Sequence, residues 1–413
     1  MTGPDDEQFL RDFETMSRFG ATGNGGVERQ AASDADGEQR AWMASLLAIY
    51  GADVQYDEIG NQFGLFHLRP GAPFVLIGSH MDSQPTAGKY DGAYGVLAAA
   101  HVAARLTAQW RDEEHVPAYN LAVVNWFNEE GSRFKPSMMG SGVFAGKLEL
   151  ADMLAVEDIQ GVSVLDALEG LGQRGTAMHE PVAAYAEIHV EQGKGLEKDG
   201  LAIGVVEATW GANKYVLTVR GEQGHTGSTA MGDRKDALLG AALLVVAARQ
   251  IAESFDDGML HTSVGQMLIY PNSPVVVASE VTILLDLRSP SADVLAEADE
   301  LLRRQITEAE LNADVVVRQS TSHRWGVQPY TESGVLLAEQ VAADLGLSHG
   351  RTMTLAGHDS TNMKDVVPTV FLFVPSVDGV SHNEAELTHD EDMLNGLRML
   401  TETVRRMCDA ALG

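Results

Sequence analysis

The chain contains a single cysteine, Cys408, among its 413 residues. One cysteine cannot form an internal disulfide, and it cannot form a metal site built from several thiolates. No apolar run reaches the ~18 residues that a membrane-spanning helix requires. The N-terminal segment lacks a basic stretch followed by an apolar one, so we expect no signal peptide and a cytoplasmic location.

Basic residues are scarce: 29 Lys and Arg stand against 59 Asp and Glu, which gives a net charge of −30. A negative field repels phosphate backbones and anionic lipid headgroups, so we expect neither nucleic acid nor membrane as a partner. It attracts divalent cations, although a generally acidic proteome would give the same charge. With 45% hydrophobic and 21% charged residues, the composition is that of a globular protein with two or three domains.

Residues that can bind metal follow strand-like apolar runs that lie far apart in the sequence. Three such runs are PFVLIGSH, NLAVVNWFNEE and AYAEIHVE. The candidate ligands are His80, Asp91, Glu129, Glu130, His189 and His382. Ligands delivered one at a time from separate strand ends indicate an active site on a rigid sheet, not a small structural zinc knot.

The ligand types indicate a catalytic metal site. Imidazole and carboxylate suit zinc, manganese, cobalt or nickel, and the missing thiolates argue against a structural site. A carboxylate such as Asp91 can bridge two cations in a two-metal hydrolase. Any lone histidine is more often a core or surface residue, and the chain has 13 of them. Three of these, however, follow strand ends inside turns rich in Gly, Asp and Glu, which favours the metal site.

The adjacent pair Glu129 and Glu130 predicts the reaction type. Neighbouring residues at a strand end point in different directions, so one carboxylate can bind metal while the other faces a water molecule. A free carboxylate there can take a proton from water and hand it to a leaving nitrogen. The alternative is a solvated acidic turn, but the apolar strand that leads into the pair favours hydrolysis.

Three further residues are candidates for the site. Asp82, two residues after His80, could orient that imidazole from behind or could be an ordinary turn aspartate. His225 lies between glycines in GEQGHTGST, after a strand-like run. Arg288 ends the run ILLDLR; its guanidinium suits a carboxylate, but an exposed strand-end arginine is equally compatible with the sequence.

The order of the expected elements predicts an α/β fold with a mostly parallel sheet, interrupted by a smaller domain. An Ala-rich helix is expected over Gly92–Gln109, with Asp91 as its N-cap. From residue 211 a β-α-β-α-β order indicates an α+β domain with an antiparallel sheet. We therefore expect a catalytic domain over 1–210 and 326–413, and an inserted domain over 211–325.

The chain resembles the M20 metallopeptidase-like amidohydrolases in GSHMDSQPTAGKYDGAYGVLAA, NEEGSRF, HVEQG, GEQGHTGSTAMGDRKDAL, LAGHDSTNM and VPSVDGVSHNEAE. More narrowly, it resembles the hydantoinase/carbamoylase branch, which holds N-carbamoyl-L-amino-acid hydrolases, β-ureidopropionases and allantoate amidohydrolases. The resemblance runs from about Gly60 to His389. EEGSRF and HVEQG separate this branch from its dipeptidase and succinylase relatives.

The resemblance implies two divalent metal ions, a general base and a set of substrate contacts. One ion would be bound by His80, Asp91 and His189, and the other by Asp91, Glu130 and His382. Glu129 would be the general base and proton shuttle. Gln192 would contact the carbamoyl end, His225 would polarise the scissile carbonyl from the partner subunit, Arg288 would bind the substrate carboxylate, and Asn272 and His358 would be further contacts. Such enzymes are homodimers through the inserted domain, which also acts as a lid.

The sequence departs from the branch around the expected substrate. PNSPVVVASE keeps Asn272 but has Val275, Ala278 and Ser279 where Asn, Pro and Gly are usual, and Ala230 replaces a proline. We therefore expect hydrolysis of the linear C–N bond of an N-carbamoyl-L-amino acid to the amino acid, CO2 and ammonia. The alternatives are an allantoate or ureido-acid amidohydrolase and an N-acyl-amino-acid amidohydrolase. A non-catalytic ligand sensor would be expected to lack part of the catalytic set, which is complete here.

Overall fold

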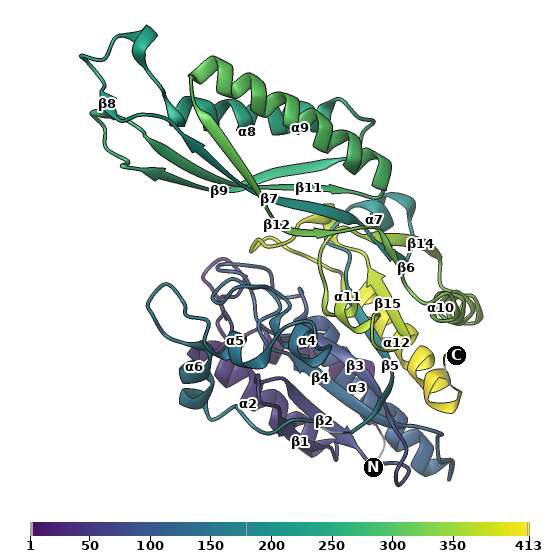
Figure 1. The fold of residues 1–413 in the computed structure, drawn as a ribbon. Coiled ribbons are helices and arrows are strands. Elements are labelled where there is room, and N and C mark those ends of the chain that lie inside the picture. Colours follow the sequence, from purple (N-terminus) through teal and green to yellow (C-terminus); the bar gives the residue numbers. More distant parts are fainter. Residues whose placement is uncertain (1–2, 179, 411, 413) are drawn as a thin grey trace. The chain divides into compact units, whose positions relative to one another are not determined.

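Two units make up the chain in the computed structural model, which describes residues 3–178, 180–410 and 412. The first comprises Met1–Glu207, Tyr330–Thr352 and Gly357–Gly413. The second comprises Ala208–Pro329 and Met353–Ala356. Figure 1 labels most of the helices and strands of both units. No helix of the described residues is long and apolar enough to cross a membrane.

A mixed sheet forms the centre of the first unit, in the order β1-β2-β4-β3-β5-β15-β6-β13. Its strands are β1 (Asp53–Tyr56), β2 (Gln62–Phe66), β3 (Phe74–His80), β4 (Asn120–Trp126), β5 (Val182–Val190), β6 (Ile203–Thr209), β15 (Thr369–Val374) and β13 (Gln328–Pro329); β14 (His349–Thr354) also pairs with β6. Only β4, β3, β5 and β15 are mutually parallel, while β1, β2, β6 and β13 pair antiparallel. The expected mostly parallel sheet is therefore correct for the centre and wrong for the edges. The turn between β1 and β2 is too short for a parallel crossover.

The central strands are buried along their length, as the apolar runs predict. All residues of β3 and β4 are buried. Helix α3 (Ala93–Asp112) is buried on nearly every side and packs against β3 and against α12 (Asp390–Asp409). The remaining helices of this unit are α1 (Asp6–Met16), α2 (Asp34–Ile49), α4 (Met139–Phe144), α5 (Leu150–Leu154), α6 (Val164–Leu171), α7 (Gly195–Asp199), α10 (Glu332–Asp344), α11 (Asp359–Met363) and the 3-10 turn η2 (Val377–Gly379).

The start of α3 differs from the expected one. Its N-cap is Gly92, without a side-chain cap hydrogen bond, and not Asp91. Gly92 has a φ of 61°, and a Cβ there would lie 2.3 Å from the His80 ring, so only glycine fits. The Asp91 carboxylate is directed to neighbouring histidines and not to the helix.

The second unit is a four-stranded antiparallel sheet, in the order β12-β7-β11-β9, with two helices on one face (Figure 1). Its elements are β7 (Gly211–Arg220), β8 (Gly224–His225), the 3-10 turn η1 (Met231–Asp233), α8 (Ala237–Glu253), β9 (His261–Tyr270), β10 (Val276–Val277), β11 (Glu280–Ser289), α9 (Ala292–Ala313) and β12 (Val316–Trp325). Strand β9 was not expected from the sequence. It lies at the sheet edge and most of its residues are exposed, so no clear period-two apolar pattern marks it.

Candidate metal centre

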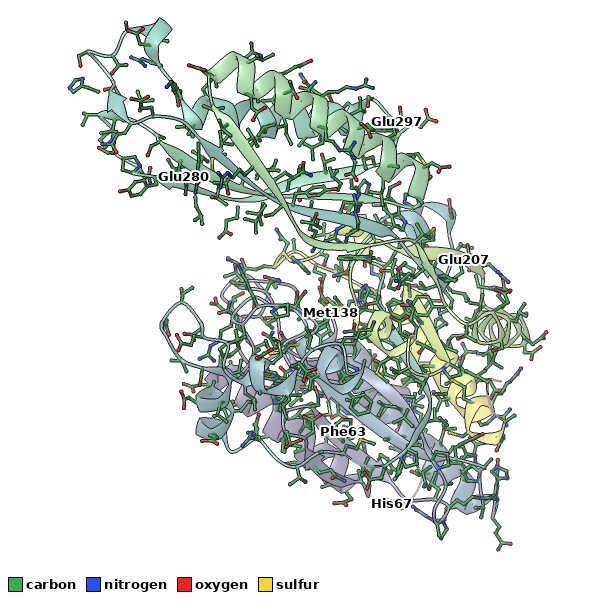
Figure 2. All side chains as sticks on the ribbon, viewed as in Figure 1. Phe63, His67, Met138, Glu207, Glu280 and Glu297 are labelled. Atoms are coloured by element: carbon green, nitrogen blue, oxygen red, sulfur yellow. The ribbon has the colours of Figure 1, made fainter. Side chains whose placement is uncertain are left out.

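The metal-ligand candidates of the first unit lie at the carboxyl ends of its parallel strands. His80 is the last residue of β3, and His189 is the next-to-last of β5. Glu129 and Glu130 lie in the turn after β4, which ends at Trp126 and not at the glutamates. Met138, labelled in Figure 2, closes this turn because its N–H donates to the Glu129 carbonyl at 2.7 Å.

The structure groups these side chains into two ligand sets that share Asp91. His80, Asp91 and His189 form one set, and Asp91, Glu130 and His382 form the other; within each set the ligand atoms lie within 4.8 Å of one another. Asp91 Oδ1 lies 3.5 Å from His80 Nε2 and 3.0 Å from His189 Nε2. Asp91 Oδ2 lies 3.3 Å from His382 Nε2. One oxygen of Asp91 therefore faces each set, which is the arrangement of a bridging carboxylate.

Hydrogen bonds to the backbone orient two of the histidines for metal binding. His80 Nδ1 lies 3.1 Å from the Asp82 carbonyl, and His189 Nδ1 lies 2.8 Å from the Val190 carbonyl. A carbonyl only accepts, so each Nδ1 carries a proton, and each Nε2, on the side of Asp91, is the nitrogen that can bind a metal ion. Imidazole nitrogen and carboxylate oxygen that face one another are the ligand types that ions such as zinc and manganese bind. The donor set therefore fits divalent metal ions.

The buried carboxylates of the cluster also indicate a site for cations. Burial raises the pKa of Glu130 to about 7, with the Asp91 charge adding to the effect. Hydrogen bonding to Asp91 raises the pKa of His382 to about 9. Burial alone would raise the pKa of Asp91, but its contacts with the three histidines hold that pKa well below the usual range. Protons or metal ions must balance these buried carboxylates.

Glu129 has its carboxylate in this cluster but belongs to neither ligand set. Its Oε2 lies 3.5 Å from His80 Nε2. Burial raises the Glu129 pKa well above the usual range; His80 opposes the shift, and the charges of Asp359 and Glu130 add to it. A buried carboxylate with a raised pKa beside a metal site is suited to accept and return a proton.

Asp82 acts on both sides of the cluster. Its carbonyl receives the His80 hydrogen bond, while its carboxylate accepts the backbone N–H groups of Glu129 at 3.1 Å and Glu130 at 3.2 Å. The carboxylate itself lies 3.7 Å from the His80 ring. Asp82 therefore orients the imidazole through its backbone, and its side chain holds the glutamate turn.

Two predicted substrate contacts lie beside Asp91 and His189. Gln192 Nε2 donates to Asp91 Oδ2 at 2.7 Å and to Ser381 Oγ at 2.9 Å, while its Oε1 has no hydrogen-bond partner among the described residues. His358 is buried, and its ring centre lies 4.5 Å from that of His189. Burial holds the His358 pKa well below the usual range, so this imidazole is neutral.

One anchor of Asp91 was missed by the sequence analysis. Glu386 Oε1 accepts the backbone N–H groups of Tyr90 at 2.9 Å and Asp91 at 3.1 Å. Its position four residues after His382, in HNEAE, was the available signal.

His225 belongs to the second unit, on the exposed strand β8. Its Nδ1 accepts the backbone N–H groups of Gly227 at 3.0 Å and Ser228 at 3.2 Å. Nδ1 is therefore a hydrogen-bond acceptor in this turn, which leaves Nε2 as the nitrogen that can donate. Arg234 closes the same turn by donating to the Thr226 carbonyl at 2.6 Å. The turn thus presents Nε2 as an N–H donor, which suits a group that polarises a carbonyl.

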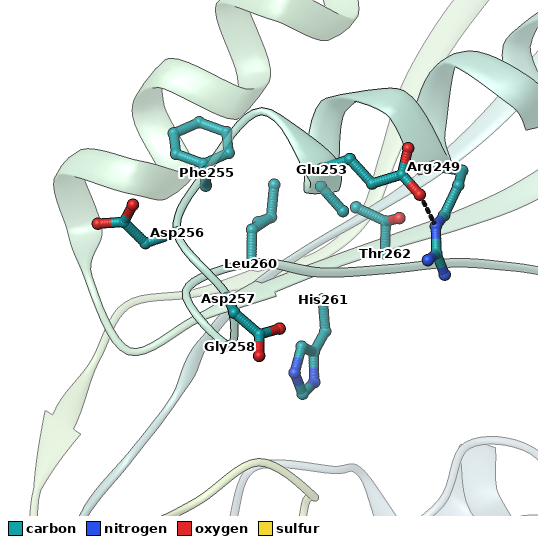
Figure 3. A pocket seen from close by; sticks show the side chains of 10 residues that line it. Arg249, Glu253, Phe255, Asp256, Asp257, Gly258, Leu260, His261 and Thr262 are labelled. Carbon is teal, nitrogen blue, oxygen red and sulfur yellow. Dashed lines mark hydrogen bonds and ion pairs between the residues drawn. The ribbon is translucent and has the colours of Figure 1, made fainter.

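Asn272 and Arg288 also belong to the second unit. Asn272 is exposed and has a φ of 50°, in the turn before β10. Arg288 lines a cavity of about 270 Å³ together with Asp286 and Leu355. A larger cavity of about 590 Å³, which shares His261 with the first, lies at the end of α8 (Figure 3).

The chain matches the sequence profile described as Peptidase family M20/M25/M40 over residues 76–406. It is 54% identical over 413 residues to a Mycolicibacterium smegmatis protein named a hydrolase, covering 98% of this chain and 94% of that one. It is 35% identical over 391 residues to the N-carbamoyl-L-amino-acid amidohydrolase of Rhizobium meliloti, covering 90% and 89%. The allantoate amidohydrolase of Bacillus subtilis is 30% identical over 405 residues, covering 95% and 96%. A solved hydantoinase/carbamoylase family amidase from Burkholderia vietnamiensis superposes with a TM-score of 0.90 at 32% identity, covering 98% of both chains.

Proposed function

Since the chain belongs to peptidase family M20/M25/M40 and is a hydrolase of C–N amide bonds, we propose that it cleaves N-carbamoyl-L-amino acids. Water would attack the carbamoyl carbon, and the products would be the amino acid, CO2 and ammonia. The observation that supports this most is the pair of ligand sets that share Asp91, with Glu129 left out of both.

Each residue of the cluster has a part in this proposal. His80, Asp91 and His189 would hold one divalent ion, and Asp91, Glu130 and His382 the other. When bound, such ions would polarise the scissile carbonyl and lower the pKa of the attacking water. Glu129 would take a proton from that water and return it to the leaving nitrogen. Gln192, with its free Oε1, would accept a hydrogen bond from the carbamoyl amide.

A ureido acid such as allantoate is the second candidate substrate. The B. subtilis relative is named an allantoate amidohydrolase. Val275 stands where the branch usually has Asn, and its carbonyl accepts the N–H of Thr226, next to His225. The departure therefore lies in the segment that pairs with the His225 strand, where it would change substrate contacts and leave the metal ligands intact.

A substrate panel distinguishes these candidates. The metal-reconstituted protein is assayed on N-carbamoyl-L-amino acids, allantoate and N-acetyl-L-amino acids, with ammonia and released acid measured separately. We expect ammonia release to be fastest on an N-carbamoyl-L-amino acid. Ammonia release confined to allantoate would favour the second candidate, and activity confined to N-acetyl substrates would contradict both.

We further propose that the protein is a homodimer in which His225 serves the metal centre of the partner. The apolar residues Leu268 and Tyr270 are exposed on the edge strand β9, which suits a contact between copies.

Glu129→Gln and His225→Asn should each be inactive alone. Because a mixed dimer would contain one intact site, mixing them should recover about a quarter of the wild-type activity. No recovery, with subunit exchange verified, would contradict the exchange of His225 between subunits.

A further inference from the structure

A group of charged side chains lies on the face of the second unit's sheet that α8 and α9 do not cover. Asp286 and Arg288 are two residues apart on β11, so their side chains share a face, while Leu287 between them is buried in the core. On the neighbouring strands, Lys214 lies opposite Asp286 and His261 lies opposite Arg288. Cross-strand neighbours on one face are close enough to interact.

Asp286 and a backbone carbonyl hold the Arg288 guanidinium. Arg288 Nε and Nη2 donate to Asp286 Oδ2 at 3.0 and 2.9 Å, and Nη1 donates to the Leu355 carbonyl at 2.6 Å. A guanidinium has five N–H donors. One donor on each terminal nitrogen therefore remains without a partner among the described residues, beside the cavity of about 270 Å³ that Arg288 and Asp286 both line.

The charges of this group suit one carboxylate. Lys214 Nζ lies 3.7 Å from Asp286 Oδ2, so Asp286 is shared by two cations. Because Asp286 also attracts Lys214, it does not by itself cancel the charge of the Arg288 guanidinium that lines the cavity. A guanidinium already held on one edge also loses little side-chain freedom when it binds an anion.

We propose that Asp286 is a positioning residue that fixes Arg288 for a single carboxylate, and thereby sets the preference for acids over the matching carboxamides. The inference rests on the proposed function, and it takes Arg288 as the residue that binds the substrate carboxylate, as the family resemblance implies. Asp286 touches no substrate; it acts through the orientation of Arg288. A purely structural role, as the cross-strand partner of Lys214, is the alternative that the experiment must separate.

The test compares N-carbamoyl-L-alanine with its carboxamide in Asp286→Ala and Asp286→Asn. We expect kcat/KM on the acid to fall ~10-fold in Asp286→Ala, mostly through KM, and to be little changed on the carboxamide. Asp286→Asn keeps one acceptor oxygen and should recover part of the loss. It also provides a second variant if Asp286→Ala does not fold. In an Arg288→Ala background, Asp286→Ala should cause no further loss on the acid.

The matched control is Glu280→Gln on the same strand. Glu280 forms the same kind of ion pair, with Arg220 Nε at 2.7 Å, at the other end of β11. We expect this variant to keep its preference for the acid. Equal losses on acid and carboxamide, additive losses in the Arg288→Ala background, or a gain in acid affinity in Asp286→Ala would each overturn the inference.

A binding measurement separates this inference from the proposed function. Butanoate carries a carboxylate without a scissile bond, and butanamide is its neutral counterpart. Saturation-transfer NMR on the full chain should give butanoate a Kd that weakens ~10-fold in Asp286→Ala, whereas butanamide should be unaffected. If no substrate of the panel is turned over but butanoate binding still weakens in Asp286→Ala, the carboxylate site is supported and the proposed reaction is contradicted. An unchanged butanoate Kd would overturn the role of Asp286 whatever the activity.

Discussion

Glu129→Gln is expected to lower kcat by ~10²- to 10⁴-fold while both metal ions stay bound, because general acid–base catalysis contributes about that much. Glutamine keeps the shape of the side chain but cannot accept a proton. Glu129 lies outside both ligand sets, so its loss removes no metal ligand. The measurement is kcat on the best panel substrate together with metal content per chain.

The matched control for this variant is Glu191→Gln. Glu191 lies two residues after His189, but its carboxylate accepts the backbone N–H groups of Gly195 and Leu196 at the start of α7. Glutamine should leave kcat within about twofold, because it keeps one acceptor oxygen for these N–H groups. Near-normal turnover by metal-loaded Glu129→Gln would rule out Glu129 as the base.

Much of the candidate site could be predicted from the sequence because its residues follow buried parallel strands. Apolar runs such as that before His80 identify the strand, and the strand end then places the ligand. The same reasoning named Asp91 both as a candidate bridging carboxylate and as a helix cap, and it could not decide between these two roles. Its actual position depends on His80, His189 and His382, which approach it from distant parts of the chain. The partition into two sets came from the family resemblance.

The features that were missed depend on pairing between strands. The strand β9 has little local signal because most of its residues are exposed. The antiparallel edges of the main sheet depend on which strands pair, and an apolar run does not encode the direction of its partner. Asp286 was visible as the residue two positions before Arg288, but its significance depends on Lys214 and Leu355, which are far from it in sequence. Local periodicity predicts elements; it does not predict which polar side chains those elements bring together.

Asp91→Asn is expected to remove both metal ions and to lower activity on the order of 10³-fold, since the bridging carboxylate serves both ions. An amide contributes one neutral oxygen and cannot balance two cations. His382→Ala is the matched comparison, because His382 belongs to only one set and its loss should leave one ion bound. Elemental analysis after dialysis measures the stoichiometry. Two tightly bound ions in Asp91→Asn would contradict the bridging role.

The pH dependence of metal binding tests the same sets without measuring activity. In the absence of metal, the pKa of His382 is raised to about 9 and that of Glu130 to about 7. Below pH 9 a metal ion must therefore displace a proton from His382, and below pH 7 from Glu130 as well. We expect the affinity for the ion of this set to fall ~10-fold per pH unit between pH 9 and 7, and more steeply below pH 7. Calorimetry with Mn²⁺ in buffers of different ionisation enthalpy counts the released protons. Affinity that is constant across this range would mean that these two side chains do not bind the ion, and only the set with His80 and His189 would remain.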